Sequence, residues 1–258
     1  MISLKLLTYN ILFDMLNIHK RTNGIINIIL NELPDIVALQ EVNSISYDIL
    51  KTNKNINKKY NFNKSQFNEM YGTLILSRFL IEEAITIPYN HTLMGRQLEY
   101  IKINVDGAKV IIATVHLESQ FPSYKDKTED SINSKVRTKI SQYIETFYTL
   151  NQIKDHHIFM MGDTNISDKE EHIFETPYNY IDIYHHMGLG NLFAYTYDYK
   201  RNKMVKGRYQ SRLDRIYYCN NTTNKAFEPL TYTLTGCTPL TSTGNCPSDH
   251  FGVIVECN

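Results

Sequence analysis

Short runs of apolar residues recur along the chain, and turn-forming residues bound most of them. Runs of four to eight apolar residues between turn formers are typical of strands that are buried on both faces. This pattern predicts strands over residues 4–10, 35–41, 71–79, 157–163, 211–219 and 251–257. Several of these runs end in polar residues, which places polar side chains at the edge of the predicted sheets.

Two longer segments show the spacing of an amphipathic helix. In residues 19–35 the apolar side chains return every three or four positions, and Pro34 ends the pattern. Proline cannot continue a helix because it lacks the backbone N–H and clashes with the preceding turn. Residues 134–152 keep the same spacing from Val136 to Leu150. We therefore predict one helix after the first strand and another before the strand at 157–163.

Residues 98–119 alternate apolar and polar positions on both sides of Asp106-Gly107, a strong local signal for a tight hairpin. An antiparallel hairpin excludes a purely parallel doubly wound sheet, and the chain has too few helices for a barrel of eight βα units. We therefore predict an α/β fold, a four-layer α/β sandwich in which two mixed sheets pack face to face with helices outside. No repeat or linker divides the chain, so residues 1–258 are predicted to be a single domain.

The composition permits a large core, because 42% of the 258 residues are hydrophobic. Lys plus Arg and Asp plus Glu both number 27, so no overall excess of charge indicates a polyanionic partner. Residues 51–64 nevertheless carry five lysines and no acid, and residues 198–215 carry seven Lys or Arg against two Asp. These two segments are either solvated loops or surfaces that face phosphate groups.

The first residues lack the basic and then apolar pattern of a secretion signal, and no window holds the roughly 18 apolar residues of a membrane span. We therefore expect an intracellular protein, in the nucleus or the cytoplasm, that is neither secreted nor embedded in a membrane. The four cysteines show no C-x-x-C spacing, which favours reduced thiols over a zinc site.

Polar residues gather at the ends of the predicted strands. They are Asn10, Gln40, Glu41, His116, Asp163, Asn165, Asp214, Asp249 and His250. Carboxylates are the ligands that Mg²⁺ prefers, and amide and imidazole groups donate hydrogen bonds to phosphoryl oxygens. The set contains no cysteine. It therefore favours a hard, oxygen-preferring cation together with a bound phosphate.

Six short motifs carry these residues in a fixed order: "TYN" (8–10), "LQE" (39–41), "HLES" (116–119), "GDTN" (162–165), "RLD" (212–214) and "SDH" (248–250). In these motifs the chain resembles the endonuclease/exonuclease/phosphatase superfamily, and the resemblance spans nearly the whole chain. Within that superfamily, "HLES", "GDTN" and the "TYD" of residues 196–198 are most similar to the tyrosyl-DNA phosphodiesterase 2 branch.

The resemblance implies a catalytic site built around one metal ion. Glu41 and Asp249 would bind Mg²⁺, with Mn²⁺ as a substitute. Asp163 would orient and deprotonate the attacking water molecule. Asn10 and Asn165 would donate hydrogen bonds from their side-chain amides to the phosphate. These roles are those of the matching motif positions in the family.

The resemblance assigns the other polar residues to charge stabilisation and to substrate contacts. His250 would stabilise the charge on the phosphate, and Asp214 would bind the second ring nitrogen of His250. The residues expected to contact the phosphate or the DNA end are His116, Ser119, Arg96, Tyr197 and Arg212. In two places the chain departs from its relatives: Tyr197 replaces their Trp, and the Arg that follows their "GDTN" is missing, with Ser167 near its position. Both departures imply altered binding of the DNA end with hydrolysis retained.

The activity implied by the resemblance is magnesium-dependent hydrolysis of the 5′-phosphotyrosyl bond between a protein tyrosine and a DNA end, as in the repair of topoisomerase adducts. The product end keeps a 5′-phosphate, and a monomer is expected. An RNA-linked protein stays open as a substrate. The alternatives are another phosphoesterase of the superfamily, such as an abasic-site endonuclease, a sphingomyelinase or an inositol-polyphosphate phosphatase, and a non-catalytic module that binds DNA ends.

Overall fold

The computed structural model describes residues 3–67, 70–120, 129–240, 242 and 244–258. Its strands form two mixed sheets and a short separate hairpin. In spatial order, the first sheet contains β13 (Pro229–Thr235), β14 (Gly252–Cys257), β1 (Leu4–Asn10), β2 (Ile36–Val42), β4 (Gly72–Ser77) and β3 (Asn61–Phe62). The second contains β5 (Ile81–Pro88), β6 (Gln97–Val105), β7 (Ala108–His116), β8 (His156–Asp163), β12 (Asp214–Asn221) and β9 (Ile181–Asp182). The hairpin pairs β10 (Tyr197–Asp198) with β11 (Gln210–Ser211).

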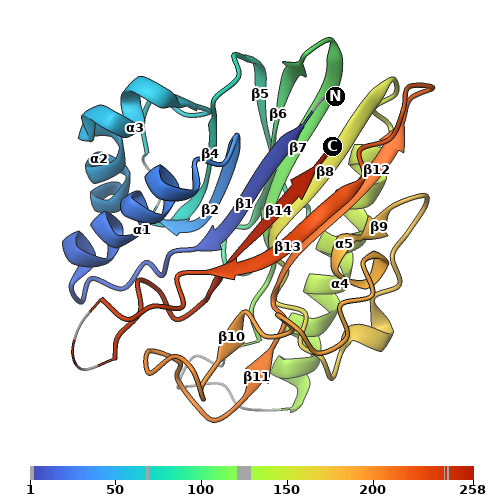
Figure 1. Cartoon of the computed structure of the whole chain (residues 1–258). Coiled ribbons are helices and arrows are strands. Elements are labelled where there is room, and N and C mark those ends of the chain that lie inside the picture. Colours follow the sequence, from blue (N-terminus) through green and yellow to red (C-terminus); the bar gives the residue numbers. More distant parts are fainter. Residues whose placement is uncertain (1–2, 68–69, 121–128, 241, 243) are drawn as a thin grey trace.

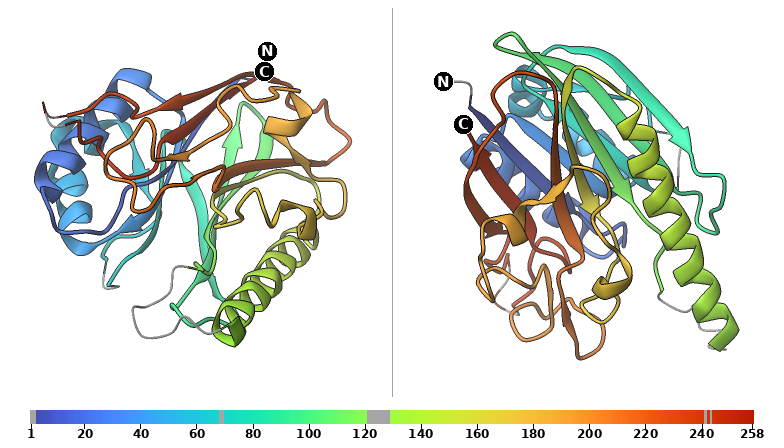
Figure 2. Two further views of the ribbon diagram at one scale, coloured as in Figure 1. Left: turned by 90° about the horizontal axis from the view of Figure 1, so that it is seen from below. Right: turned by 90° about the vertical axis from the view of Figure 1, so that its right-hand side faces the viewer.

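Helices cover the outer faces of both sheets (Figures 1 and 2). The first sheet is covered by α1 (Ile18–Glu32), α2 (Ser44–Thr52) and α3 (Lys54–Lys59), and the second by the long α4 (Glu129–Asn151). The short α5 (Ile183–His186) follows β9. The predicted four-layer α/β sandwich is confirmed. Among the helices that the structure describes, none combines the length and the apolar character needed to cross a membrane.

Three hydrophobic cores separate the four layers. Alternate residues of the central strands point to opposite faces, so Leu6 of β1 enters the core between the sheets whereas Leu7 faces the helices α1–α3. In β8, Phe159 likewise faces the other sheet and Ile158 faces α4. Because both faces of these strands are buried, their sequences are continuous apolar runs without alternation.

Two parallel strand pairs bring their carboxyl ends to the same end of the sandwich. In the first sheet β1 lies parallel to β2, with Asn10 opposite Gln40. In the second sheet β7 lies parallel to β8, with His116 opposite Asp163. The other neighbouring strands are antiparallel. The polar residues that end these four strands are therefore collected at one edge of each sheet.

Most elements predicted from the apolar pattern are confirmed. The hairpin at Asp106-Gly107 joins β6 to β7, and the two turn residues have φ angles of 49° and 93°. The predicted helices are observed as α1 and α4, the latter beginning earlier, at Glu129. The pattern missed the edge strands β5 and β13, because polar and charged residues occupy their exposed positions.

The basic segment 51–64 is mainly helical. It forms the end of α2 and all of α3, so it is mostly not a loop, although Lys54, Lys58 and Lys59 are exposed to solvent. Two asparagines explain the local fold: Asn43 begins α2 with a capping box, and the side chain of Asn53 accepts hydrogen bonds from the first backbone N–H groups of α3. Lys64, at the end of the segment, forms an ion pair with the buried Glu99. Part of this positive charge is thus used within the fold.

Candidate active site

A cavity of about 320 Å³ lies where the carboxyl ends of β2, β7 and β8 meet the turn that precedes β14. The predicted site residues that line it are Glu41, Arg96, His116, Ser119, Asp163, Asn165, Tyr197, Asp249 and His250. These residues come from both sheets and from loops spread over most of the chain. Their convergence is the geometry expected from motifs placed at strand ends.

Asp163 lies at the centre of this cavity and is hydrogen-bonded from both sheets. The side chain of Asn10 donates to Oδ2 of Asp163 at 2.9 Å and to Oε1 of Glu41 at 3.1 Å. Nε2 of His116 lies 3.4 Å from the same Oδ2 atom. The backbone N–H of Asn165 donates to Oδ1 at 2.9 Å. Asn10 therefore joins the carboxylates of the first sheet to those of the second.

The surroundings of Asp163 raise the pKa of its carboxyl group toward neutral pH. Burial raises the pKa of Asp163 to about 7, against the opposing positive charge of His250, and the carboxylate of Asp214 adds to the rise. A carboxylate with a pKa near the working pH is suited to accept a proton from water. The geometry and the pKa thus agree with a general base at this position.

His116 is held as a neutral imidazole. A guanidinium nitrogen of Arg96 lies 2.7 Å from Nδ1 of His116. Because the guanidinium can only donate, Nδ1 accepts, and the ring proton is on Nε2 facing Asp163. Burial and the positive charges of Arg96 and His250 keep the pKa of His116 well below its usual value. The ring is therefore a neutral hydrogen-bond donor at the cavity wall.

His250 has the opposite charge state. Its Nδ1 lies 2.8 Å from Oδ2 of the fully buried Asp214, the partner that the motifs indicated. Burial lowers the pKa of His250, but the carboxylates of Asp214 and Asp163 outweigh burial and raise that pKa well above its usual value. Nε2 of His250 lies 3.9 Å from Asp163 and lines the cavity. An imidazolium therefore points its second N–H toward the space where a phosphate would bind.

Glu41 and Asp249 form the acidic side of the cavity. Glu41 occupies the left-handed region, with φ 59°, and its carboxylate accepts hydrogen bonds from the backbone N–H of Phe13 and from Asn10. Burial raises the pKa of Asp249 to about 6; His250 opposes this rise, and the negative charge of Glu41 adds to it. Two carboxylates that repel one another across an oxygen-lined space fit a hard divalent cation, which would remove the repulsion.

Two other acidic clusters have distances compatible with a metal ion, in the described part of the chain. Possible ligand atoms of Asp163, Asp214 and His250 lie within 4.8 Å of one another, but Asp214 and His250 already bind each other. The second cluster contains Glu171, Asp182 and His185. There Arg212 and Arg215 already bind the carboxylates, so that cluster is an ion-pair network.

The structure does not bring Arg212 to the cavity. Its guanidinium binds both carboxylate oxygens of Asp182, at 3.0 and 2.9 Å, and the side chain is buried. Asp182 precedes α5, on the side of β12 that faces away from the cavity lining. Sequence reasoning placed Arg212 at the substrate because it belongs to the "RLD" motif. In that motif Leu213 lines the cavity and Asp214 binds the ring of His250, whereas Arg212 does neither. Arg212 supports the framework behind it.

Tyr197 and Asn165 line the cavity with part of their surfaces already used. Tyr197 is 2% exposed, stacks on Tyr209 at a centroid distance of 4.9 Å, and contacts the edge of the His250 ring. It offers little free area for a base to stack on. The side-chain amide of Asn165 donates to the carbonyl oxygen of Leu117, which leaves one amide hydrogen for a phosphate.

Two aromatic residues that sequence reasoning missed also line the cavity. Phe13 stacks on Tyr71 with ring centroids 4.5 Å apart, and the guanidinium of Arg96 lies 5.1 Å from the centre of the Tyr71 ring. Lys206, from the basic segment 198–215, also lines the cavity, which supports the interpretation of that segment as a phosphate-facing surface. The position of Phe13, three residues after "TYN", was the only available signal for the aromatic residues.

Comparisons with known proteins identify the family to which the chain is similar. Residues 7–250 match the model of the Endonuclease/Exonuclease/phosphatase family. The chain is 30% identical to tyrosyl-DNA phosphodiesterase 2 of Xenopus tropicalis over 97% of its length and 65% of that protein, and 28% identical to the Homo sapiens protein of that name over 98% and 67%. It thus spans about two thirds of the length of these relatives.

Solved structures show the same fold. A D. rerio TDP2 structure in complex with single-strand DNA product superposes with a TM-score of 0.82 at 24% identity, covering 99% of both chains. A family protein from Bacteroides thetaiotaomicron superposes with a TM-score of 0.72 at 15% identity, covering 99% of this chain and 97% of that one. With the family model matching nearly the whole chain, the protein belongs to the endonuclease/exonuclease/phosphatase family.

Proposed function

We propose that this protein is a metal-dependent phosphodiesterase that hydrolyses the bond between a tyrosine side chain and the 5′-phosphate of a DNA end. The observation that carries the proposal is the buried Asp163, hydrogen-bonded to Asn10 from the other sheet and flanked by a neutral and a charged histidine. The similarity to curated tyrosyl-DNA phosphodiesterases over nearly the whole chain supports the choice of substrate.

The acidic pair is assigned to the cation. Glu41 and Asp249 would hold Mg²⁺, with Mn²⁺ as a substitute, and the ion supplies positive charge to the phosphate oxygens when it is bound. A pair of carboxylates, which offers oxygen ligands only, suits these two ions. Phe13 N–H and Asn10 orient the Glu41 carboxylate independently of the ion.

The chain's own residues then bind the phosphate and move one proton. Asp163 takes a proton from the attacking water, which forms the new P–O bond while the bond to the tyrosine oxygen breaks. His250 and His116 donate N–H groups to the phosphate oxygens, and Asn165 adds its remaining amide hydrogen. Asn10 instead donates both of its amide hydrogens to Asp163 and Glu41, so it positions these two carboxylates and does not contact the phosphate directly. Preorganised donors of this kind stabilise the charge that develops in the transition state. Asp214 fixes the ring of His250 through Nδ1.

The leaving group needs little help. A tyrosine phenolate has a pKa of ~10, so it departs more easily than a sugar alkoxide, and none of the cavity-lining residues named above is a suitable acid apart from His250. Departure of the phenolate, which solvent then protonates, leaves a 5′-phosphate on the DNA. This chemistry favours an aryl ester over an ordinary internal phosphodiester.

The DNA end is assigned to the side of the cavity that carries Arg96, Ser119 and Lys206. Lys206 belongs to a loop rich in Lys and Arg, which would attract the phosphates of the strand. Phe13 and Tyr71 offer the stacked aromatic surface for a base or for the tyrosyl ring. Residues 1–258 would act as one catalytic domain and as a monomer. Repair of protein-linked DNA ends would place the protein inside the cell, in the nucleus or the cytoplasm.

The test is a substrate panel measured in one buffer with Mg²⁺ and again with excess chelator. The panel contains a 5′-tyrosyl oligodeoxynucleotide, its RNA counterpart, an abasic duplex, sphingomyelin and an inositol polyphosphate. We expect fast, metal-dependent release of tyrosine from the DNA substrate. Equal or faster turnover of the abasic duplex, the lipid or the inositol phosphate would reject this assignment in favour of another phosphoesterase of the family. Tight binding of the DNA end without turnover would indicate a non-catalytic module.

A further inference from the structure

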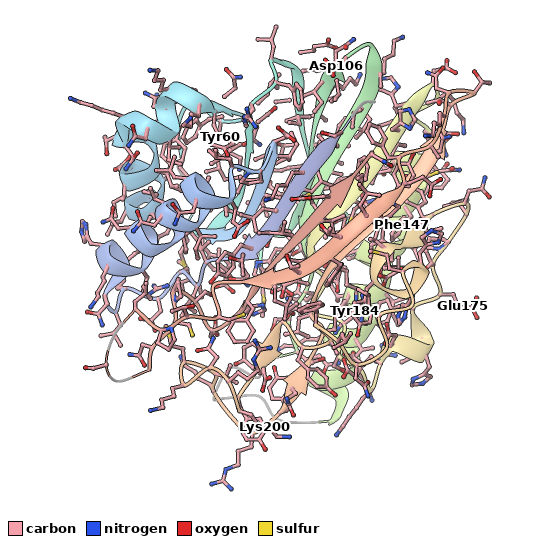
Figure 3. All side chains as sticks on the ribbon, viewed as in Figure 1. Tyr60, Asp106, Phe147, Glu175, Tyr184 and Lys200 are labelled. Atoms are coloured by element: carbon pink, nitrogen blue, oxygen red, sulfur yellow. The ribbon has the colours of Figure 1, made fainter. Side chains whose placement is uncertain are left out.

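A second cavity, of about 430 Å³, lies at the end of the sandwich away from the active site. Its walls are the β6–β7 turn at residues 106–108, the first residues of β8, and the segment 224–227 after β12. Figure 3 labels Asp106 at one end of the molecule and Lys200, in the loop between β10 and β11, at the other. His157 and Asp163 lie at opposite ends of β8, so roughly 20 Å of strand separates the two cavities.

His157 presents an unpartnered hydrogen-bond donor to this second cavity. The hydroxyl of Tyr218 accepts from the backbone N–H of Phe227 at 2.9 Å and lies 2.9 Å from Nδ1 of His157. Among the described residues, Nδ1 of His157 is the acceptor that the hydroxyl proton of Tyr218 can reach. Tyr218 therefore donates a hydrogen bond to Nδ1. The remaining ring proton is therefore on Nε2, and no described residue accepts from it.

The position of this donor is fixed by packing. His157 is 1% exposed, and Phe227 packs edge to face on its ring with centroids 4.9 Å apart. Burial lowers the pKa of His157, with a further contribution from His156, so the ring stays neutral at physiological pH. A buried, rigid side chain that lines an open cavity and keeps an unused N–H is a feature of ligand sites, where a few placed polar groups set the orientation.

In the rest of the second cavity, apolar and charged side chains line different parts of the wall. Ala108, Ala226 and Phe227 supply apolar walls beside the imidazole. Lys225 stands exposed at the rim and forms no ion pair with any residue that the structure describes. The acid that lines the cavity, Asp106, belongs to the β6–β7 turn on the other wall. A flat ring could contact the apolar wall while an anionic group reaches the lysine.

We propose that this second cavity binds a mononucleotide, with a ring acceptor of the base on Nε2–H of His157 and the phosphate beside Lys225. The size of the cavity is in the range of small-molecule sites and accommodates one nucleotide. A flat base fills the space between the alanines and Phe227, and the repulsion from Asp106 directs the phosphate to the opposite rim. The site is separate from the catalytic cavity and does not depend on the substrate proposed for it.

The test uses the full chain and AMP, GMP, CMP and UMP as probes, followed by NMR of backbone amides. We expect the amide signals of Gly107 and Ala226 to shift with saturation, whereas binding at the catalytic cavity is detected separately at Asn165. The parent nucleosides and ribose 5-phosphate distinguish the two halves of the ligand, and both should bind more weakly than the nucleotide. No shift at Gly107 or Ala226 with any nucleotide at millimolar concentration would reject the site.

Three variants locate the binding. Ala226→Trp fills the cavity from a half-buried position and should abolish the shifts at Gly107. Lys225→Ala should weaken binding about threefold, as loss of one exposed charge contact does. Lys109→Ala, an equal change of charge on β7 outside the cavity lining, is its control and should have no effect. His157→Phe should weaken binding about tenfold through loss of one hydrogen bond.

If His157→Phe fails to fold, Lys225→Ala and Ala226→Trp still test the proposal, because they alter exposed or half-buried residues. Affinity that is unchanged in both of them would overturn the proposal, because the ligand would then be bound elsewhere. Equal weakening by Lys225→Ala and Lys109→Ala would likewise reject a specific phosphate contact and indicate general attraction by surface charge.

Discussion

Two buried clusters of charged residues lie on either side of β12, and they differ in how completely their charges are paired. In the ion-pair network, Arg212 and Arg215 face the carboxylates of Glu171 and Asp182, two positive charges against two negative ones. The contact between Arg212 and Asp182 is bidentate. Although burial raises the pKa of Glu171, the neighbouring Arg215 and Arg212 outweigh burial and hold it far below its usual value.

The active-site cluster is left unbalanced. Asp163 and Asp214 share one positive partner, His250, whose charge also acts on Asp249. In the part of the chain that the structure describes, neither Glu41 nor Asp249 forms an ion pair with a lysine or an arginine. The pKa values of Asp163 and Asp249 are correspondingly raised, to about 7 and about 6. Unpaired negative charge attracts a cation, and a carboxylate whose pKa is raised toward neutral pH can accept a proton from water. The paired cluster supports the fold, and the unpaired cluster carries the chemistry.

Removal of the metal should have the largest effect on activity, and it should act through the active-site cluster and not through the ion-pair network. Excess chelator is expected to abolish turnover of a 5′-tyrosyl oligonucleotide, and added Mg²⁺ or Mn²⁺ should restore it, because Glu41 and Asp249 lose the ion that their charges require. The comparison is made by rate assays with and without the chelator. Glu171→Gln, in the ion-pair network, is the control and should leave the metal requirement unchanged. Full activity in excess chelator contradicts the assigned role of the acidic pair.

Asp163→Asn should lower kcat by about 10²–10⁴-fold, the usual loss for a general base. It should not lower stability. The folded-state pKa of Asp163 lies above the unfolded value of ~4, so this carboxylate costs stability as the pH rises from that value to about 7, and the amide removes that cost. Thermal unfolding and steady-state kinetics measure the two effects. A kcat close to that of the wild type shows that another group accepts the proton.

Arg212→Met should destabilise the fold by about 3–5 kcal/mol, because it leaves a buried carboxylate of Asp182 without its bidentate partner. The folded variant should keep its kcat, since Arg212 does not reach the cavity. Arg78→Met is the matched control: Arg78 pairs with Asp35 at the surface and should contribute about 0–1 kcal/mol. Urea unfolding gives both values. If Arg212→Met lost activity while its stability stayed unchanged, the prediction that Arg212 contacts the substrate would be restored.

The pH dependence should show the smallest effect. Because Asp163 must be ionised to accept a proton, kcat/KM is expected to fall about tenfold per unit as the pH drops below the pKa of about 7. Rates on the tyrosyl oligonucleotide over a pH series, at saturating metal, measure the slope. The stability of the paired cluster should not change in that range, because the pKa of Glu171 is far lower. A flat profile below neutral pH excludes Asp163 as the base.

The local pattern of apolar and polar residues predicted the central strands, because these strands are buried on both faces. Continuous apolar runs such as that of β8 result from such burial, and the Asp106-Gly107 turn requires residues that tolerate positive φ. The edge strands β5 and β13 escaped prediction for the same physical reason. Each is largely exposed and carries polar residues between its apolar ones, so it lacks the continuous apolar run that marked the central strands.

The motifs also predicted which polar residues would meet. A strand end that follows an apolar run lies at the rim of a sheet, and two parallel pairs bring four such ends together. Glu41, His116, Asp163 and His250 accordingly line one cavity. The contribution of Phe13 and Tyr71 could not be predicted, since their stacking joins a loop to the start of a distant strand.

The sequence by itself determined the layers of the sandwich and the polar ends of its strands, because both depend on residues a few positions apart. Only the tertiary structure decided their charge states and partners. The hydrogen bond from Asn10 to Asp163 joins residues 153 positions apart, and burial of Asp163 between two sheets sets its pKa. Arg212 and Asp214 stand two positions apart in one motif, and in a regular strand they would share a face. They bind different clusters because Arg212 lies in the connection between β11 and β12, whereas Asp214 begins β12.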